Sequence, residues 1–551
     1  MKRRTIIKQM GLAFSALAVS DVSRAGNFLN DLSGNEKIMN GLFKPTWESL
    51  QGYKVPDWYR NAKFGIWAHW GPQCQPEAGD WYARGMYEEG SGQYKYHLQK
   101  YGHPSKFGFK DVINEWKADQ WNPEELVALY KDAGAKYFFA MANHHDNLDL
   151  YDSKYQRNWN SLKVGPKKDI IGGWAKAARN NGLPFGCSIH AAHAWRWFET
   201  AQRHDKNGDL AGVPYDGNLT RKDGKGKWWE GLNPQELYAQ NHPLSKDSWN
   251  NGSIHRQWHW GEGVYPPSKE YIEKFVNRTI QLINKYEPDL LYFDDSQLPF
   301  WPISDAGLRI TAHHYNKSLK KHGQLRAVVN GKILDENQRK ALVWDIERGQ
   351  ANDIMPDVWQ TDTCLGNWHY DRSVFDRKAY KTPEMVIQTM VDVVSKNGNY
   401  LLNVPVRGDG SIDELERKIV GEITGWMKLN SESIYDTRPW KIYGEGPSTQ
   451  NQAKLNGQGF NEGRTRFSAA DIRFTQKEQT LYATVMKWPD DRTVLIKDLG
   501  SMSSLYPQKI NQVTWLDSGV SLEFEKQQDG LLVKFPERSP QFAYANVLKI
   551  V

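Results

Sequence analysis

The 551-residue sequence predicts an α/β fold, a (β/α)8-like TIM barrel, followed by a C-terminal antiparallel β-sandwich. Two observations predict the barrel. Short apolar runs alternate with amphipathic helical segments from about residue 57 to 430, and no glycine-rich phosphate-binding loop follows any run. The sandwich is predicted because the apolar period changes to two after about residue 440.

The N-terminal residues 1–25 are typical of an export signal peptide. Four basic residues among the first eight precede an apolar stretch at 10–19, and Arg3-Arg4 resembles a twin-arginine signal. We therefore expect export to the periplasm or the extracellular space. The stretch is too short for a membrane span, and no later segment is a candidate.

The composition indicates a globular protein that is rich in aromatic side chains. Much of the net charge of +6 lies in the N-terminal segment, so no nucleic-acid partner is expected. The 24 Trp and 26 Tyr have flat faces that suit sugar rings as well as cores. The three Cys are widely spaced, which argues against a disulfide framework or a zinc cluster.

The barrel is predicted to span residues 40–430. A helix begins at Asn122-Pro123 and ends at Gly134, a longer one spans 268–286, and a third follows Asp413. The glycine-rich and charged residues 200–267 are expected to form a long insertion at the active-site rim. Seven apolar runs are predicted to be buried strands: 63–70, 136–142, 183–190, 290–294, 325–330, 341–347 and 399–404.

The sandwich is predicted to span residues 440–551. Its expected strands lie at 481–488, 493–499, 513–516 and 521–535, the last of them folded at an Asp529-Gly530 turn.

Polar side chains lie where the predicted barrel strands end, which is where barrel enzymes bind substrate. Carboxylates at two strand ends suit glycoside hydrolysis, which uses one as nucleophile or base and the other as proton donor. A strand-end Asp taken alone more often caps a helix or pairs with Lys. The side chains are His69, His144, His145, His190, Asp294, Asp295, Asp345 and Glu347.

The histidines allow a second interpretation, a zinc-dependent hydrolase that uses these residues with Asp294 as ligands. The local spacings expected of zinc-ligand pairs are missing, so no metal and no organic cofactor is expected.

Several longer motifs, in order along the chain, resemble glycoside hydrolase family 29, the retaining α-L-fucosidases. The resemblance covers roughly residues 40–550. The motifs are 58–66 leading into His69-Trp70-Gly71, 133–137 through His144-His145-Asp146, 397–403, 430 with 434–438, 444–447, 471–475 and 481–483.

The resemblance implies a role for each candidate residue. Asp294 aligns with the family's nucleophile, whereas strand alternation alone does not choose between Asp294 and Asp295. Glu347 lies where an acid/base is expected, with Asp345 on the same strand face as an alternative. The substrate-binding residues that it implies are His69, Trp81, His144 and His145. His190, from its place at a strand end, and Trp67 and Tyr292, which stand where other aromatics usually border the sugar, are further substrate-binding candidates.

The expected activity is therefore that of an exo-acting retaining α-L-fucosidase, which removes terminal α-L-fucose from oligosaccharides or polysaccharides by double displacement. Departures from the family pattern, such as Asn143 before the double histidine and Ser188-Ile189-His190 on the next strand, leave alternatives open. These are an α-L-galactosidase of the same family acting on an algal-type galactan, and a catalytically inactive glycan-binding barrel. Linkage, aglycone and oligomeric state are left open.

Overall fold

The computed structural model describes residues 35–551 except 252–258, 262, 451, 453, 456–458 and 464. The predicted signal peptide at 1–25 lies outside the described residues. Among those described, no helix combines the length and the apolar character needed to cross a membrane.

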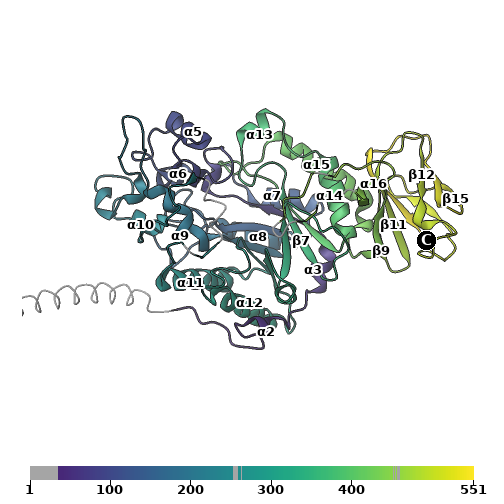
Figure 1. The fold of residues 1–551 in the computed structure, drawn as a ribbon, viewed down its shortest axis with the longest axis horizontal. Helices are drawn as coiled ribbons and strands as arrows, with labels where there is room; N and C mark the ends of the chain where they lie inside the picture. The colour runs from purple at the N-terminus through teal and green to yellow at the C-terminus, as the bar shows by residue number, and fades with distance from the viewer. Residues whose placement is uncertain are drawn as a thin grey trace, which may run out of the picture. The chain divides into compact units, whose positions relative to one another are not determined.

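Eight parallel strands pair in chain order and close into a barrel, with β8 beside β1, which confirms the predicted fold class. Figure 1 shows the course of the chain from its N-terminal part in purple to its C-terminal strands in yellow. Each of the seven predicted apolar runs contains or overlaps one of these strands. The strands are β1 (Phe64–Ala68), β2 (Phe138–Asn143), β3 (Phe185–Ile189), β4 (Leu290–Phe293), β5 (Val328–Gly331), β6 (Val343–Glu347), β7 (Trp359–Cys364) and β8 (Gly398–Asn403).

Strand β7 is absent from the predicted set because its four central residues are polar. They are buried nonetheless, and their hydrogen bonds are made inside the protein. The Gln360 amide donates to Asp345 Oδ1 at 2.7 Å, and the Thr361 hydroxyl donates to the Ile346 carbonyl at 2.9 Å. A buried polar group that is satisfied in this way costs little, so hydropathy alone does not reveal the strand.

Helices follow most of the strands, and the three predicted helices form where their capping residues indicate. The side chain of Asn122 caps α7, that of Ser268 caps α11 and that of Asp413 caps α15. Residues 348–358, between β6 and β7, form no helix. The barrel helices are α7 (Pro123–Asp132), α8 (Ile170–Asn180), α11 (Lys269–Tyr286), α12 (Ala306–His322), α14 (Pro383–Ser395) and α15 (Glu414–Asn430).

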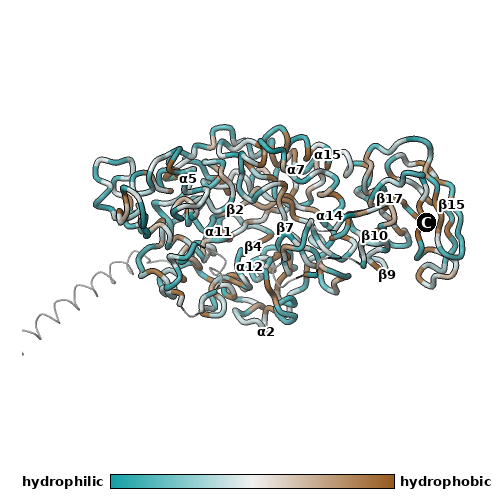
Figure 2. The backbone as a smooth tube through the Cα atoms, turned by 45° about the horizontal axis from the view of Figure 1, so that its top comes forward, coloured by the Kyte–Doolittle hydropathy of each residue, from teal (hydrophilic) through white to brown (hydrophobic). Residues whose placement is uncertain are grey.

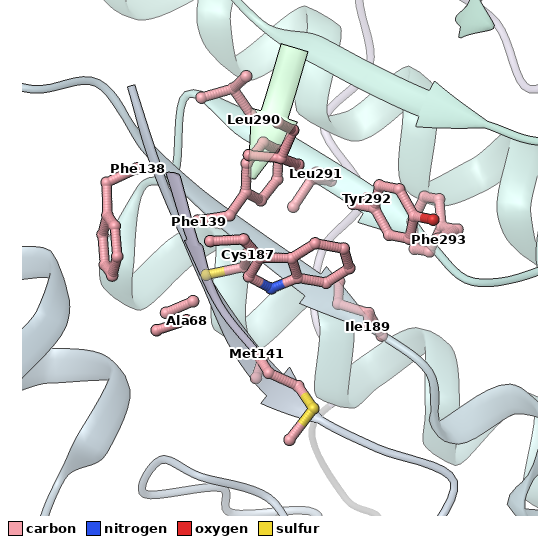
Figure 3. Close-up of a cluster of buried hydrophobic side chains, with 14 of the residues drawn as sticks. Ala68, Phe138, Phe139, Met141, Cys187, Ile189, Leu290, Leu291, Tyr292 and Phe293 are labelled. Atoms are coloured by element: carbon pink, nitrogen blue, oxygen red, sulfur yellow. The ribbon is translucent and has the colours of Figure 1, made fainter. Parts of the chain in front are cut away.

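Aromatic side chains fill the barrel from within and also attach its helices. Phe138 and Phe139 lie on opposite sides of β2 (Figure 3). The Phe139 ring faces Trp67 and Tyr292 across the interior, whereas Phe138 packs on Trp174 of α8. Figure 2 shows hydrophobic positions within these elements and hydrophilic positions along many outer loops.

Shorter helices precede the barrel and lie between β1 and β2. They are α2 (Trp47–Leu50), α3 (Asp57–Ala62), α4 (Tyr82–Gly85), α5 (Gly92–Lys100) and α6 (Phe109–Glu115). The segment at 200–267 packs on this region through buried Asp216. Its carboxylate accepts hydrogen bonds from the Tyr87 hydroxyl at 2.6 Å and the Lys110 ammonium at 3.0 Å. The described part of the segment includes the short helix α10 (Pro234–Tyr238).

Two antiparallel sheets follow the barrel and enclose a second hydrophobic core, as the sequence predicts for a sandwich. The Asp529-Gly530 turn joins β15 to β16. One sheet has the order β14-β13-β17-β11-β10-β9 and the other β12-β16-β15. The strands are β9 (Arg438–Glu445), β10 (Ile472–Lys477), β11 (Thr480–Lys487), β12 (Thr493–Ile496), β13 (Val513–Trp515), β14 (Val520–Ser521), β15 (Glu523–Lys526), β16 (Leu531–Lys534) and β17 (Tyr544–Ile550).

A buried ion cluster joins barrel helix α14 to strand β10. Asp392 Oδ1 lies 2.5 Å from Arg473 Nε, and its Oδ2 lies 2.6 Å from Lys396 Nζ. Burial acts to raise the pKa of Asp392, but the two cations outweigh it and hold this pKa below its usual value. One carboxylate therefore faces two buried cations and offsets one of their two charges.

We expect Asp392→Ala to lower the free energy of unfolding by about 3–5 kcal/mol, because it leaves Arg473 and Lys396 buried without their counter-ion. Urea unfolding followed by circular dichroism measures the change. Met385→Ala on the same helix is the control: this side chain is exposed, so its loss should cost less than about 0.5 kcal/mol. Equal midpoints for the two variants would show that the cluster contributes nothing.

Candidate active site

A pocket of about 310 Å³ opens at the carboxyl ends of the barrel strands. Eight of the nine predicted site residues line it: Trp67, His69, Trp81, His144, His190, Tyr292, Asp294 and Glu347. The ninth, His145, is fully buried and lies against Asp294. The other lining residues are Asp80, His259, Ser296, Lys332, Ile333, Arg348, Asp362, Trp368, His369 and Phe460.

Asp294, just after β4, is held as an anion. Lys332 Nζ lies 2.6 Å from its Oδ1, while His145 Nε2 and His190 Nδ1 each lie 3.2 Å from its Oδ2. Burial acts to raise the pKa of Asp294, but Lys332 and the two imidazoles outweigh this and hold it well below the usual value. An ionised carboxylate facing the pocket can act as a nucleophile.

Asp295 has a different position and partner. Its Oδ1 lies 2.6 Å from His193 Nε2, on the 3-10 turn after β3. Of these two adjacent acids, the described pocket wall includes Asp294 and leaves out Asp295. The structure therefore separates two residues that strand alternation alone left equivalent.

Glu347, the last residue of β6, shares Lys332 with Asp294. Its Oε2 lies 2.6 Å from the same Nζ. Burial, together with the carboxyl groups of Asp362 and Asp294, raises the pKa of Glu347 to about 7 although Lys332 acts to lower it. Glu347 can therefore hold a proton near neutral pH while Asp294 stays ionised.

Asp345, the alternative acid, belongs to a buried network instead. It accepts a hydrogen bond from Gln360, and its Oδ2 lies 3.4 Å from the Tyr292 hydroxyl. That hydroxyl donates to Asp362 Oδ2 at 2.8 Å. Burial raises the pKa of Asp345 to about 7 and that of Asp362 well above its usual value. Within the described structure Glu347 lines the pocket and Asp345 does not.

Aromatic rings form one wall of the pocket. The Trp67 ring centroid lies 4.9 Å from that of Tyr292 and 5.5 Å from that of Trp368. Trp81 reaches the pocket from a left-handed backbone position, with φ of 61°. Such a backbone is costly outside glycine and is often found at functional sites. Flat rings beside carboxyl groups suit a sugar.

A histidine cluster forms another part of the pocket. His69, His144 and His369 bring one ring nitrogen each to within 4.8 Å of the others, as do His144, His145 and His190. Burial lowers the pKa of His69 and of His144 well below the usual value, so these rings are neutral. Neutral imidazoles can exchange hydrogen bonds with sugar hydroxyls, and the same nitrogens could bind a metal ion.

Lys332 and Asp362 are the main residues that the sequence analysis missed. Lys332 follows Gly331 at the end of β5, so the strand-end argument could have found it. Asp362 lies in the polar strand β7, and Trp368-His369 follow that strand, so all three were hidden with it. Arg348 and Phe460 belong to no motif and no predicted strand end, so the sequence did not indicate them.

Comparison with known proteins gives the family. The family model for alpha-L-fucosidase matches residues 32–432, and that for the alpha-L-fucosidase C-terminal domain matches residues 466–551. The chain belongs to the α-L-fucosidase family, glycoside hydrolase family 29. The resemblance seen in the sequence motifs is thereby confirmed.

Individual members of the family are similar to this chain at low identity. Rat (Rattus norvegicus) tissue alpha-L-fucosidase is 25% identical over 509 residues, covering 90% of this chain and 89% of the relative. Human (Homo sapiens) plasma alpha-L-fucosidase is 25% identical with the same coverage. The structure of Thermotoga maritima alpha-fucosidase in complex with fucose superposes with a TM-score of 0.66 at 24% identity, covering 92% of this chain and 100% of that one.

Proposed function

We propose that this protein is an exo-acting retaining α-L-fucosidase that removes terminal α-L-fucose from glycans. The observation that carries the proposal is the pair of carboxyl groups on one lysine, Asp294 ionised and Glu347 able to hold a proton. Family membership supplies the sugar. The N-terminal pattern supports action outside the cytoplasm.

The spacing of the two carboxyl groups supports retention of anomeric configuration. Both contacting oxygens lie 2.6 Å from Lys332 Nζ, so they are at most twice that distance apart. An inverting enzyme needs about 6.5–9.5 Å between its carboxyl groups to hold a water molecule, whereas a retaining enzyme has about 5–5.5 Å. The arrangement fits nucleophilic attack followed by hydrolysis of a glycosyl-enzyme.

The roles follow from the protonation states. Asp294 attacks the anomeric carbon while Glu347 gives its proton to the departing oxygen, so a covalent fucosyl-enzyme forms and the aglycone leaves. Glu347, now ionised, takes a proton from a water molecule that attacks the same carbon and frees Asp294. An ionised carboxylate beside a carboxyl group that can hold a proton also argues against a barrel that only binds glycans. Trp67, Tyr292 and the neutral histidines hold the sugar ring.

The matched variants Asp294→Asn and Asp295→Asn test the proposal on an aryl α-L-fucoside. We expect the first to lose about 10⁴-fold or more in kcat, because its nucleophile is gone. The second keeps most of its activity, since it changes a residue outside the described pocket wall. Initial rates of aglycone release measure both, and proton NMR of the wild-type product reports the retained anomer.

Equal losses in the two variants would contradict the assignment of Asp294. The same assay on an aryl α-L-galactoside checks the sugar, and faster turnover of that substrate than of the fucoside would overturn the proposed specificity.

The pH profile tests Glu347 as the acid. The pKa of Glu347 is raised to about 7, so this carboxyl group is protonated at lower pH and loses its proton at higher pH. We therefore expect kcat/KM to fall as the pH rises through about 7. Glu347→Ala should lose about 10²–10⁴-fold on a substrate that needs protonation. Azide should restore turnover of an activated aryl fucoside in this variant and give the α-fucosyl azide.

Asp345 also has a pKa raised to about 7, so the pH profile does not separate the two acids and azide rescue does. Rescue of Asp345→Ala in place of Glu347→Ala would move the catalytic role to Asp345.

Lys332→Met tests the shared cation. Without the ammonium group the pKa values of Asp294 and Glu347 should both rise, because a nearby positive charge no longer stabilises the carboxylate form of either group. Both limbs of the kcat/KM profile should therefore move to higher pH. The control is Lys332→Arg, which keeps a positive charge and should keep the acid limb near its wild-type position. The rise of kcat/KM at low pH, the acid limb, reports the ionisation of Asp294. If this limb does not move in Lys332→Met, Lys332 does not set the ionisation of Asp294.

A further inference from the structure

A segment from beyond the barrel pairs with the end of the strand that carries Glu347. Gly459 forms a parallel β-bridge with Glu347, and the Phe460 amide donates to the Glu347 carbonyl at 2.8 Å. The Glu462 amide then donates to the Arg348 carbonyl at 3.0 Å. Residues 459–462 therefore lie at the pocket mouth although β9 and the helix α16 (Pro447–Gln450) precede them in the chain.

Gly459 allows this close approach. Its φ is 125°, and a Cβ atom placed there would lie 2.1 Å from the Glu347 carbonyl oxygen. Any other residue would push the segment away from β6.

Two side chains that follow Phe460 in the chain, the amide of Asn461 and the carboxylate of Glu462, anchor the segment. The Glu462 carboxylate accepts hydrogen bonds from Arg348 Nε at 2.8 Å, Lys381 Nζ at 2.9 Å and the Thr363 hydroxyl at 2.6 Å. Burial acts to raise the pKa of Glu462, but these partners outweigh it and lower the pKa. Asn461 exchanges hydrogen bonds with the backbone of Gln350. Phe460 is thus held between fixed neighbours.

The Phe460 side chain lines the pocket and is 47% exposed. A single exposed apolar residue is ordinary on a protein surface. This ring differs because it is anchored at both ends and faces the pocket beside the residue that holds the transferable proton. Its backbone is also left-handed, with φ of 59°, a conformation that a bulky residue rarely adopts without a compensating role.

We propose that Phe460 forms the leaving-group subsite and stacks on the apolar face of the sugar that carries the terminal fucose. The inference rests on the proposed function. A general acid must lie within hydrogen-bond reach of the glycosidic oxygen, so the departing sugar starts beside Glu347. Phe460 is hydrogen-bonded to the Glu347 carbonyl and lines the pocket, so its ring faces the departing sugar. Aromatic faces suit pyranose C–H surfaces.

The test compares two donors that share the fucosyl group and differ in what departs. Methyl α-L-fucoside releases methanol, whereas an α-L-fucosyl disaccharide, the best-cleaved of a set covering different linkages, releases a sugar. Both departing oxygens need a proton from the acid, and only the disaccharide has a ring that Phe460 could stack on. We expect Phe460→Ala to lower the ratio of kcat/KM for the disaccharide to kcat/KM for the methyl fucoside about 5- to 10-fold, the size of one lost aromatic contact. Phe460→Trp should restore the ratio.

Controls separate this subsite from indirect effects. Trp228→Ala removes another exposed aromatic side chain, outside the described pocket wall, and should leave the ratio unchanged. An unchanged ratio in Phe460→Ala would overturn the subsite, as would an equal fall for both donors, which would mean that Phe460 acts by supporting Glu347. A wild-type enzyme that cleaves neither donor would instead refute the proposed function.

Discussion

The candidate active site depends on one buried lysine that two carboxyl groups share. Lys332 is 2% exposed and lies 2.6 Å from both Asp294 and Glu347. One ammonium group can neutralise one carboxylate. Asp294 takes that role because two imidazoles also face it, and Glu347, with Asp362 nearby, is left to hold a proton. Double displacement needs one ionised and one protonated carboxyl group. This difference follows from the numbers of positive and negative groups that are buried together.

The barrel supplies the geometry for this sharing. Strand β4 pairs with β5, and β5 pairs with β6, so Lys332 extends from the strand that lies between the two carboxyl-bearing strands. Neighbouring strands are about 4.8 Å apart, which leaves a gap of about two such spacings between β4 and β6. A long, flexible ammonium side chain can contact groups on both sides of that gap, where a shorter one would reach one side.

The sequence predicted most of the barrel and of the site because both rest on local patterns. Apolar runs gave seven strands, capping residues gave the helix starts, and strand ends gave Asp294 and Glu347. The failures share a physical cause. Strand β7 is polar yet buried, and its side chains hydrogen-bond to residues elsewhere in the chain, such as Thr363 to Glu462. Likewise, Phe460 enters the pocket through a pairing across more than a hundred residues.

That distant pairing lies beside an irregular connection of the barrel, the one after β6. Residues 348–358 form no helix after β6, whereas α12 is the next helix after β4 and α15 is the next helix after β8. The segment at 459–462 pairs with the end of β6 and ties the backbone of Glu347 to residues that lie beyond β9. A carboxyl group that gives and takes a proton works best when its backbone is fixed. The C-terminal part of the chain therefore contributes to the position of Glu347, the proposed acid, as well as to the stability of the fold.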